Sequence, residues 1–186
     1  MNIISNTCIG AYIMRDCIQQ PYANPFCWNI IDATSMYNLI KNFDNIDFTN
    51  YDLHKDDNWN FWIEIDNQVN VKYVHYHFSP QDYVIRRYNV DVFYNRIWEY
   101  ITNCYDKRLA RMKDNPIFII ATSYPHDFYS ESDIKKICSI DTPYDIVICN
   151  NHISLETSKH IFLDTTLIEN NEQLAKDIWR DIHEKI

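Results

Sequence analysis

The chain has 186 residues, of which 46% are hydrophobic, 15% aromatic and 23% charged, a balance typical of a folded globular protein. This length predicts one domain over residues 1–186, large enough to be stable without disulfides. The single glycine, Gly10, excludes phosphate-binding loops of the G-x-G-x-x-G and P-loop types. The formal net charge of −9 argues against a nucleic-acid partner, because binding to phosphate backbones needs clustered Lys and Arg.

No segment predicts membrane insertion or secretion. The longest uncharged run, residues 17–31, contains two Gln, two Pro and two Asn and is too short to span a bilayer. The start of the chain lacks the basic and apolar regions of a signal peptide, so we expect a cytoplasmic protein. In that reducing compartment the six cysteines are predicted to be free thiols. The oligomeric state is left open.

The start of the chain predicts a strand, a helix and a loop. Residues 2–5 predict a short buried strand, and apolar residues then recur at helical spacing from Ile9 to Cys17. Residues 20–28 contain two prolines, each of which favours extended geometry in the preceding residue, and so predict a loop.

A second helix follows this loop, with Asp32 or Ser35 as its N-cap. Its apolar stripe consists of Met36, Leu39, Ile40 and Phe43. Residues 44–60 are rich in Asn and Asp without a sustained period, and they predict a long surface connection.

A β-hairpin and the longest helix come next. Residues 62–65 and 69–78 are β-rich runs on either side of Asp66-Asn67, residue types that tolerate positive φ in tight turns. Residues 91–112 keep three-and-four apolar spacing and therefore predict a helix. We expect its polar face to carry Arg96, Glu99, Asp106 and Arg108.

Strands and helices alternate over the rest of the chain. The pattern predicts strands at 117–122, 146–149 and 160–163, a helix at 131–138 capped by Ser130, and a terminal helix striped by Leu174, Ile178, Trp179 and Ile182. This alternation favours a parallel sheet. We therefore predict an α/β fold, a single-domain three-layer sandwich with a largely parallel sheet and an inserted β-hairpin.

Cys8 is the first candidate for catalysis, because it falls at the first turn of the predicted helix after the first strand. The positive end of the helix dipole favours a thiolate there. Backbone N–H groups of the same turn, near Asn6, can donate to an oxyanion during acyl transfer. The structural alternative is an inert buried cysteine.

Two histidines, His75 and His77, alternate onto one face of the predicted hairpin strand. Either ring is a candidate general base for Cys8, with Asp82 as the carboxylate that orients it. A metal site built from the same histidines with His126 or Asp127 is an alternative, but no motif completes a ligand set, and we expect neither a metal nor a cofactor.

Residues that follow the predicted strands are candidates for substrate contacts. His126 lies just after the strand at 117–122, and ligands of parallel sheets gather outside the carboxyl ends of strands. Trp28, Trp59 and Trp62 flank predicted loops, where an aromatic ring can stack on a sugar.

Five segments together resemble a known pair of families: Ile4–Gly10, Pro21–Phe26, Val74–His77, Trp98 with Arg108 and Arg111, and Asn115–Ile120. Their order is similar to two related bacterial and viral families of unknown function. One is labelled papain-like cysteine peptidase and the other exopolysaccharide biosynthesis protein. The resemblance covers residues 2–150.

The resemblance implies that Cys8 is the family's cysteine and that His75 or His77 is its histidine. We also predict substrate contacts from Asn6, Asn24 and Phe26. We therefore hypothesise a cytoplasmic enzyme acting on a glycan or its activated precursor, with Cys8 as nucleophile and His77 as base. The alternative is a non-catalytic glycan- or protein-binding module that uses the same cleft.

Overall fold

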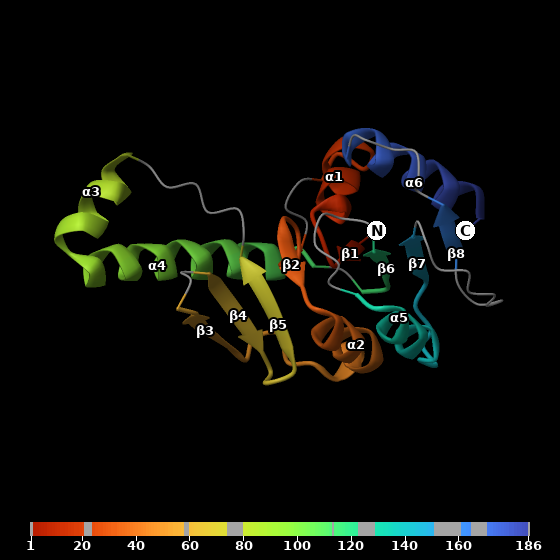
Figure 1. Ribbon diagram of the computed structural model, residues 1–186, viewed down its shortest axis with the longest axis horizontal. Helices are drawn as coiled ribbons and strands as arrows, with labels where there is room; N and C mark the ends of the chain where they lie inside the picture. Colours follow the sequence, from red (N-terminus) through yellow and green to blue (C-terminus); the bar gives the residue numbers. More distant parts are fainter. Residues whose placement is uncertain are drawn as a thin grey trace.

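Two four-stranded sheets organise the described part of the protein (Figure 1). The computed structural model describes residues 2–20, 24–57, 60–73, 80–112, 114–122, 129–150, 161–164 and 171–185. The first sheet is parallel throughout, and the second is antiparallel throughout.

The parallel sheet has the strand order β1-β6-β7-β8. Its strands are β1 (Asn2–Ser5), β6 (Pro116–Ala121), β7 (Ile146–Asn150) and β8 (Ile161–Asp164). β6 and β7 are nearly continuous apolar runs, and every residue of β1 is buried, because a parallel strand is covered on both faces. Alternate residues therefore enter different cores: Ile3 packs on one side of the sheet and Ile4 on the other.

Helices cover both faces of the parallel sheet (Figure 1). On one face lie α1 (Ile9–Asp16) and α6 (Asn171–Lys185), and on the other lie α2 (Ala33–Asn42), followed by the short turn η1 (Phe43–Asn45), and α5 (Glu131–Cys138). The predicted caps are confirmed. The Asp32 carboxylate accepts from the Ser35 N–H, and Ser130 forms a capping box at the start of α5.

The antiparallel sheet has the order β2-β5-β4-β3. Its strands are β2 (Asn29–Ile31), β3 (Tyr51–Lys55), β4 (Phe61–Ile65) and β5 (Val69–Tyr73). The predicted hairpin is confirmed in β4 and β5, and Asp66 and Asn67 have φ of 52° and 53° at its turn. One hydrophobic core joins the two sheets, since Ile63 and Val71 share it with Phe118 of β6.

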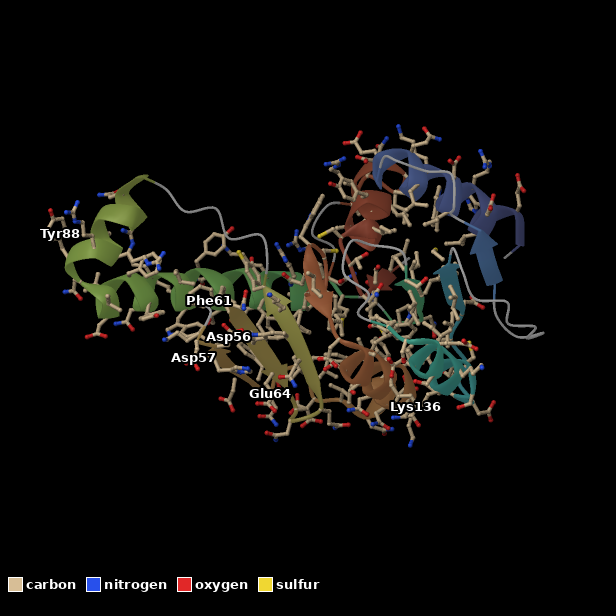
Figure 2. All side chains as sticks on the ribbon, viewed as in Figure 1. Asp56, Asp57, Phe61, Glu64, Tyr88 and Lys136 are labelled. Atoms are coloured by element: carbon tan, nitrogen blue, oxygen red, sulfur yellow. The ribbon has the colours of Figure 1, made fainter. Side chains whose placement is uncertain are left out.

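The longest helix, α4 (Val90–Leu109), packs on the antiparallel sheet, where the rings of Phe61 and Trp98 lie 5.3 Å apart. With α3 (Pro80–Tyr88) it forms an arm that extends away from the parallel sheet (Figure 1). Tyr88 lies at the outer end of this arm (Figure 2) and is 78% exposed.

Three sequence-based expectations need correction. The fold is a mixed α/β structure with two sheets, so a single three-layer sandwich with an inserted hairpin is not confirmed. The predicted connection at 44–60 contains β3, an edge strand whose half-exposed, polar sequence gives no strand pattern. Neither β2, with three residues, nor α3 was predicted.

The turn from β1 into α1 depends on Gly10. A Cβ at this position would lie 2.7 Å from the Ser5 Cβ and 3.3 Å from the Ile3 Cγ2. The first turn of α1 therefore approaches β1 more closely than any side chain allows. The only glycine of the chain stands where backbone packing requires it.

We expect Gly10→Ala to destabilise the protein by about 1–3 kcal/mol, because the added methyl group overpacks the contact with Ser5. Helix propensity alone predicts the opposite sign, a gain of roughly 1 kcal/mol for Ala over Gly. Urea unfolding measures the difference. The loss should shrink in a Ser5→Gly background, and a stabilised Gly10→Ala protein would show that the contact is unimportant.

Candidate functional site

The residues after β1 place Cys8 at the carboxyl edge of the parallel sheet. Cys8 has helical dihedral angles, and its carbonyl accepts a hydrogen bond of 3.1 Å from the Tyr12 N–H. The Thr7 hydroxyl accepts from the Ile9 N–H, so the cap of α1 is supplied by Thr7, and the Cys8 sulfur makes no capping hydrogen bond. The partly buried thiol thus lies at the predicted strand–helix junction.

Burial decides the protonation of this thiol. It raises the pKa of Cys8 from 9.0 to about 11. A helix dipole favours a thiolate at this position, whereas burial, the cause of the raised pKa of Cys8, favours the neutral thiol. At neutral pH the resting side chain is therefore a protonated thiol, and a nucleophilic role requires a base close to the sulfur.

The bases expected from the sequence, His75 and His77, lie outside the described residues, as does His126. The proximity of His75 or His77 to Cys8 therefore stays a prediction. Asp82 belongs to α3, and its side chain also lies outside the described residues. In Figure 1 α3 lies at the outer end of the arm, away from α1, and the role of Asp82 in orienting a base of Cys8 stays a prediction.

The Asn6 side chain is committed to the backbone of β6. Its amide nitrogen donates to the Ala121 carbonyl at 3.0 Å, and its amide oxygen accepts from the Ala121 N–H at 2.9 Å. The Asn6 carbonyl also accepts from the Ile31 N–H of β2 at 3.1 Å. Asn6 is only 1% exposed. These bonds give the Asn6 side chain a structural role in place of the substrate contact that we expected.

Asn24 and Phe26, expected at a substrate cleft, are also interior residues. The Asn24 amide donates to the Asn2 side chain and to the Ile3 carbonyl, at 2.7 and 2.8 Å, and accepts from the Phe26 N–H at 2.9 Å. These bonds cover the outer edge of β1. The Phe26 ring is 2% exposed and packs 6.2 Å from Phe48. The Asn24–Phe26 segment therefore packs in the interior beside β1.

Arg108 of α4 stabilises the loop before β2, next to the antiparallel sheet. Its guanidinium donates to the Cys27 carbonyl at 2.9 Å and lies 5.9 Å from the centre of the Tyr73 ring. Arg108 is 6% exposed, so the expectation that it belongs to the solvated face of its helix is wrong. Helical spacing assigned it to that face, but the turn before β2 covers it.

Among the expected substrate residues that the structure describes, Asn6, Asn24 and Phe26 are buried and Trp28 is partly exposed, beside α1. Its ring lies edge-on to Tyr12, with centroids 5.1 Å apart, and the Arg15 guanidinium lies over both rings. The sequence did not single out Tyr12 or Arg15. Their spacing from Cys8, four and seven residues along one helix, was the available signal.

The sequence matches no protein-family model and no curated protein. In the part of the chain that the structure describes, no group of three His, Cys, Asp or Glu side chains is placed to hold a metal ion. None of the described helices is both long and apolar enough to cross a membrane. The functional argument therefore depends on the geometry around Cys8.

We expect Asn6→Ala to lower the free energy of unfolding by about 2–4 kcal/mol, because it leaves the buried N–H and C=O of Ala121 without partners. Chemical denaturation measures the loss. Asn38→Ala is the matched control, since the partly buried Asn38 amide makes one bond to the Gln68 carbonyl. Equal stability of the two variants would contradict a structural role for Asn6.

Proposed function

We propose that this protein is a cysteine-dependent hydrolase or acyl transferase with Cys8 as its nucleophile. The observation that carries the proposal is the position of Cys8 at the junction of β1 and α1. The glycan, or its activated precursor, is proposed as substrate from the resemblance to the exopolysaccharide-associated family.

In the proposed reaction the Cys8 thiol loses its proton to a base, and the sulfur attacks an acyl carbonyl of the substrate. The carbonyl oxygen becomes an oxyanion, and N–H groups of the first turn of α1, other than the Ile9 N–H that donates to the Thr7 hydroxyl, stabilise it. Collapse forms a thioester, and the departing sugar hydroxyl takes the proton from the base. Water or an acceptor hydroxyl then releases the acyl group.

This chemistry needs a base because burial keeps the pKa of Cys8 near 11 in the absence of one. We propose His77, with His75 as the second choice, because both follow β5 in the predicted strand. A histidine near its ordinary pKa removes the proton at neutral pH and stabilises the thiolate as imidazolium.

The rate of iodoacetamide labelling, followed for each cysteine by mass spectrometry, tests this pairing. Alkylation rises with pH until the thiol is fully ionised. With a histidine partner, Cys8 is expected to label selectively below pH 7, and His77→Ala should shift its inflection towards 11. Cys17, at the other end of α1, is the internal control, since its pKa is also raised by burial.

A different outcome would remove the nucleophile from the proposal. If Cys8 labels only as the pH approaches 11 and keeps pace with Cys17, the thiol has no activating base. The same result in wild type and in a His75→Ala, His77→Ala double variant would exclude both histidines.

Cys8→Ala is expected to keep the melting temperature within a few degrees while abolishing turnover, because the side chain is only partly buried. Differential scanning calorimetry measures the first effect. A drop of more than about 10 °C, which corresponds to several kcal/mol in a protein of this size, would instead identify Cys8 as a packing residue.

The second candidate is a glycan- or protein-binding module without catalysis. The raised pKa of Cys8 favours it, as does the burial of Asn6 and Asn24, since neither observation supplies chemical activation. The labelling profile separates the two candidates, because a binding module has no reason to ionise Cys8 below pH 7.

A further inference from the structure

Strand β3 is an outer edge of the antiparallel sheet (Figure 1). The Asp66 N–H donates to the Asn50 carbonyl at 2.8 Å, in register with the pairing of β3 and β4. Alternate residues of an antiparallel ladder bond the same neighbour, so Tyr51 and Leu53 turn their backbone groups away from β4. No residue that the structure describes forms a hydrogen bond with these outward N–H and C=O groups.

The backbone of β3 is suited to pairing with a further strand. Proteins protect an open edge with proline, with a bulge, or with charges that repel another strand. The sequence of β3 contains no proline, and its five residues pair with β4 in one unbroken register. The charges of β3 therefore decide whether this edge repels or accepts another strand.

Those charges are of opposite kinds and lie on one face of β3. Asp52 lies directly opposite Glu64 of β4, a like-charge pair that is unfavourable, and no described cation forms an ion pair with either carboxylate. His54, two residues further along, is exposed on the same face, and its ring stacks 6.4 Å from Trp62. The strand thus presents an acid and a base in alternate positions.

We propose that two copies of this protein associate through β3, antiparallel to each other, with the two-fold axis at Leu53. The two antiparallel sheets then form one continuous sheet across the dimer. In this register the N–H and C=O groups of Leu53 bond those of Leu53 in the second copy. Asp52 faces His54 of the second copy, and the symmetry repeats this favourable pair.

Charge disfavours the neighbouring registers. A two-fold axis at Asp52 places two carboxylates opposite each other, and an axis at His54 places Asp52 opposite Asp56 of the second copy. The net charge of −9 opposes association at long range, so the favoured register is the one with local attraction. A contact between two short strands buries little surface, and we therefore expect a weak dimer that forms as concentration rises.

Sedimentation velocity from about 1 µM to about 1 mM, the range of weak protein contacts, measures the dissociation constant of the dimer. His54→Asp places a carboxylate opposite Asp52 of the second copy. We expect it to raise the dissociation constant by about 5- to 30-fold, because both pairs of the dimer become like-charge pairs. The double variant Asp52→Lys, His54→Asp exchanges the two charges and should restore association to within about 3-fold of wild type.

His183→Asp is the matched control, because His183 is an exposed histidine of α6 whose ring also lies beside a tryptophan, 5.0 Å from Trp179. It makes the same change in net charge and should leave the dissociation constant unchanged. Circular dichroism is expected to show wild-type unfolding transitions for His54→Asp and for the double variant, since the side chains of Asp52 and His54 are exposed.

Hydrogen exchange at the Leu53 amide tests the backbone pairing directly. We expect exchange at this outward N–H to slow as the wild-type protein is concentrated, and to stay fast at every concentration in His54→Asp.

Three results would overturn the inference. The first is a wild-type protein that stays monomeric throughout the concentration range, including the case in which a different protein occupies β3. The second is a dimer that His54→Asp and His183→Asp weaken equally. The third is a folded double variant that fails to associate, because the exchanged charges then have no effect on the pairing.

Discussion

The buried amide of Asn6 is the interaction on which the rest of the structure depends. Its side chain bonds both backbone groups of Ala121 in the parallel sheet, and its carbonyl accepts from Ile31 in the antiparallel sheet. Buried backbone groups must be paired, so this one residue joins the two sheets at the point where β1 ends. Tyr129 reinforces the junction by donating to the Ile31 carbonyl.

The candidate site is built outward from that junction. Two residues after Asn6, the chain turns into α1, and Gly10 allows the helix to approach β1 closely enough for the turn to close. Cys8 is held between these two constraints. The Asn24 segment supports the turn from the outer edge of β1 and ends at Trp28, which packs beside Tyr12. Buried polar residues thus provide a rigid scaffold for a small, partly exposed face.

Much of this arrangement was predictable where the signal is local. The short strand β1, the apolar runs of β6 and β7, the hairpin around Asp66, and the caps at Asp32 and Ser130 all follow from local sequence signals. The sequence also placed Cys8 at a strand–helix junction. It did not distinguish functional asparagines from structural ones, because an amide that bonds a distant backbone has the same sequence signature as one that binds a ligand.

By itself the sequence determined the α/β class, most helices and strands, and the positions of the candidate cysteine and aromatic residues. Only the tertiary structure decided that the strands form two sheets, that Arg108 is interior, and that Asn6 and Asn24 are internal supports. Burial also raises the pKa of Cys8. The physical reason is shared: burial and hydrogen-bond partners come from residues far away in the chain, whereas periodicity, capping and turn chemistry act within a few residues.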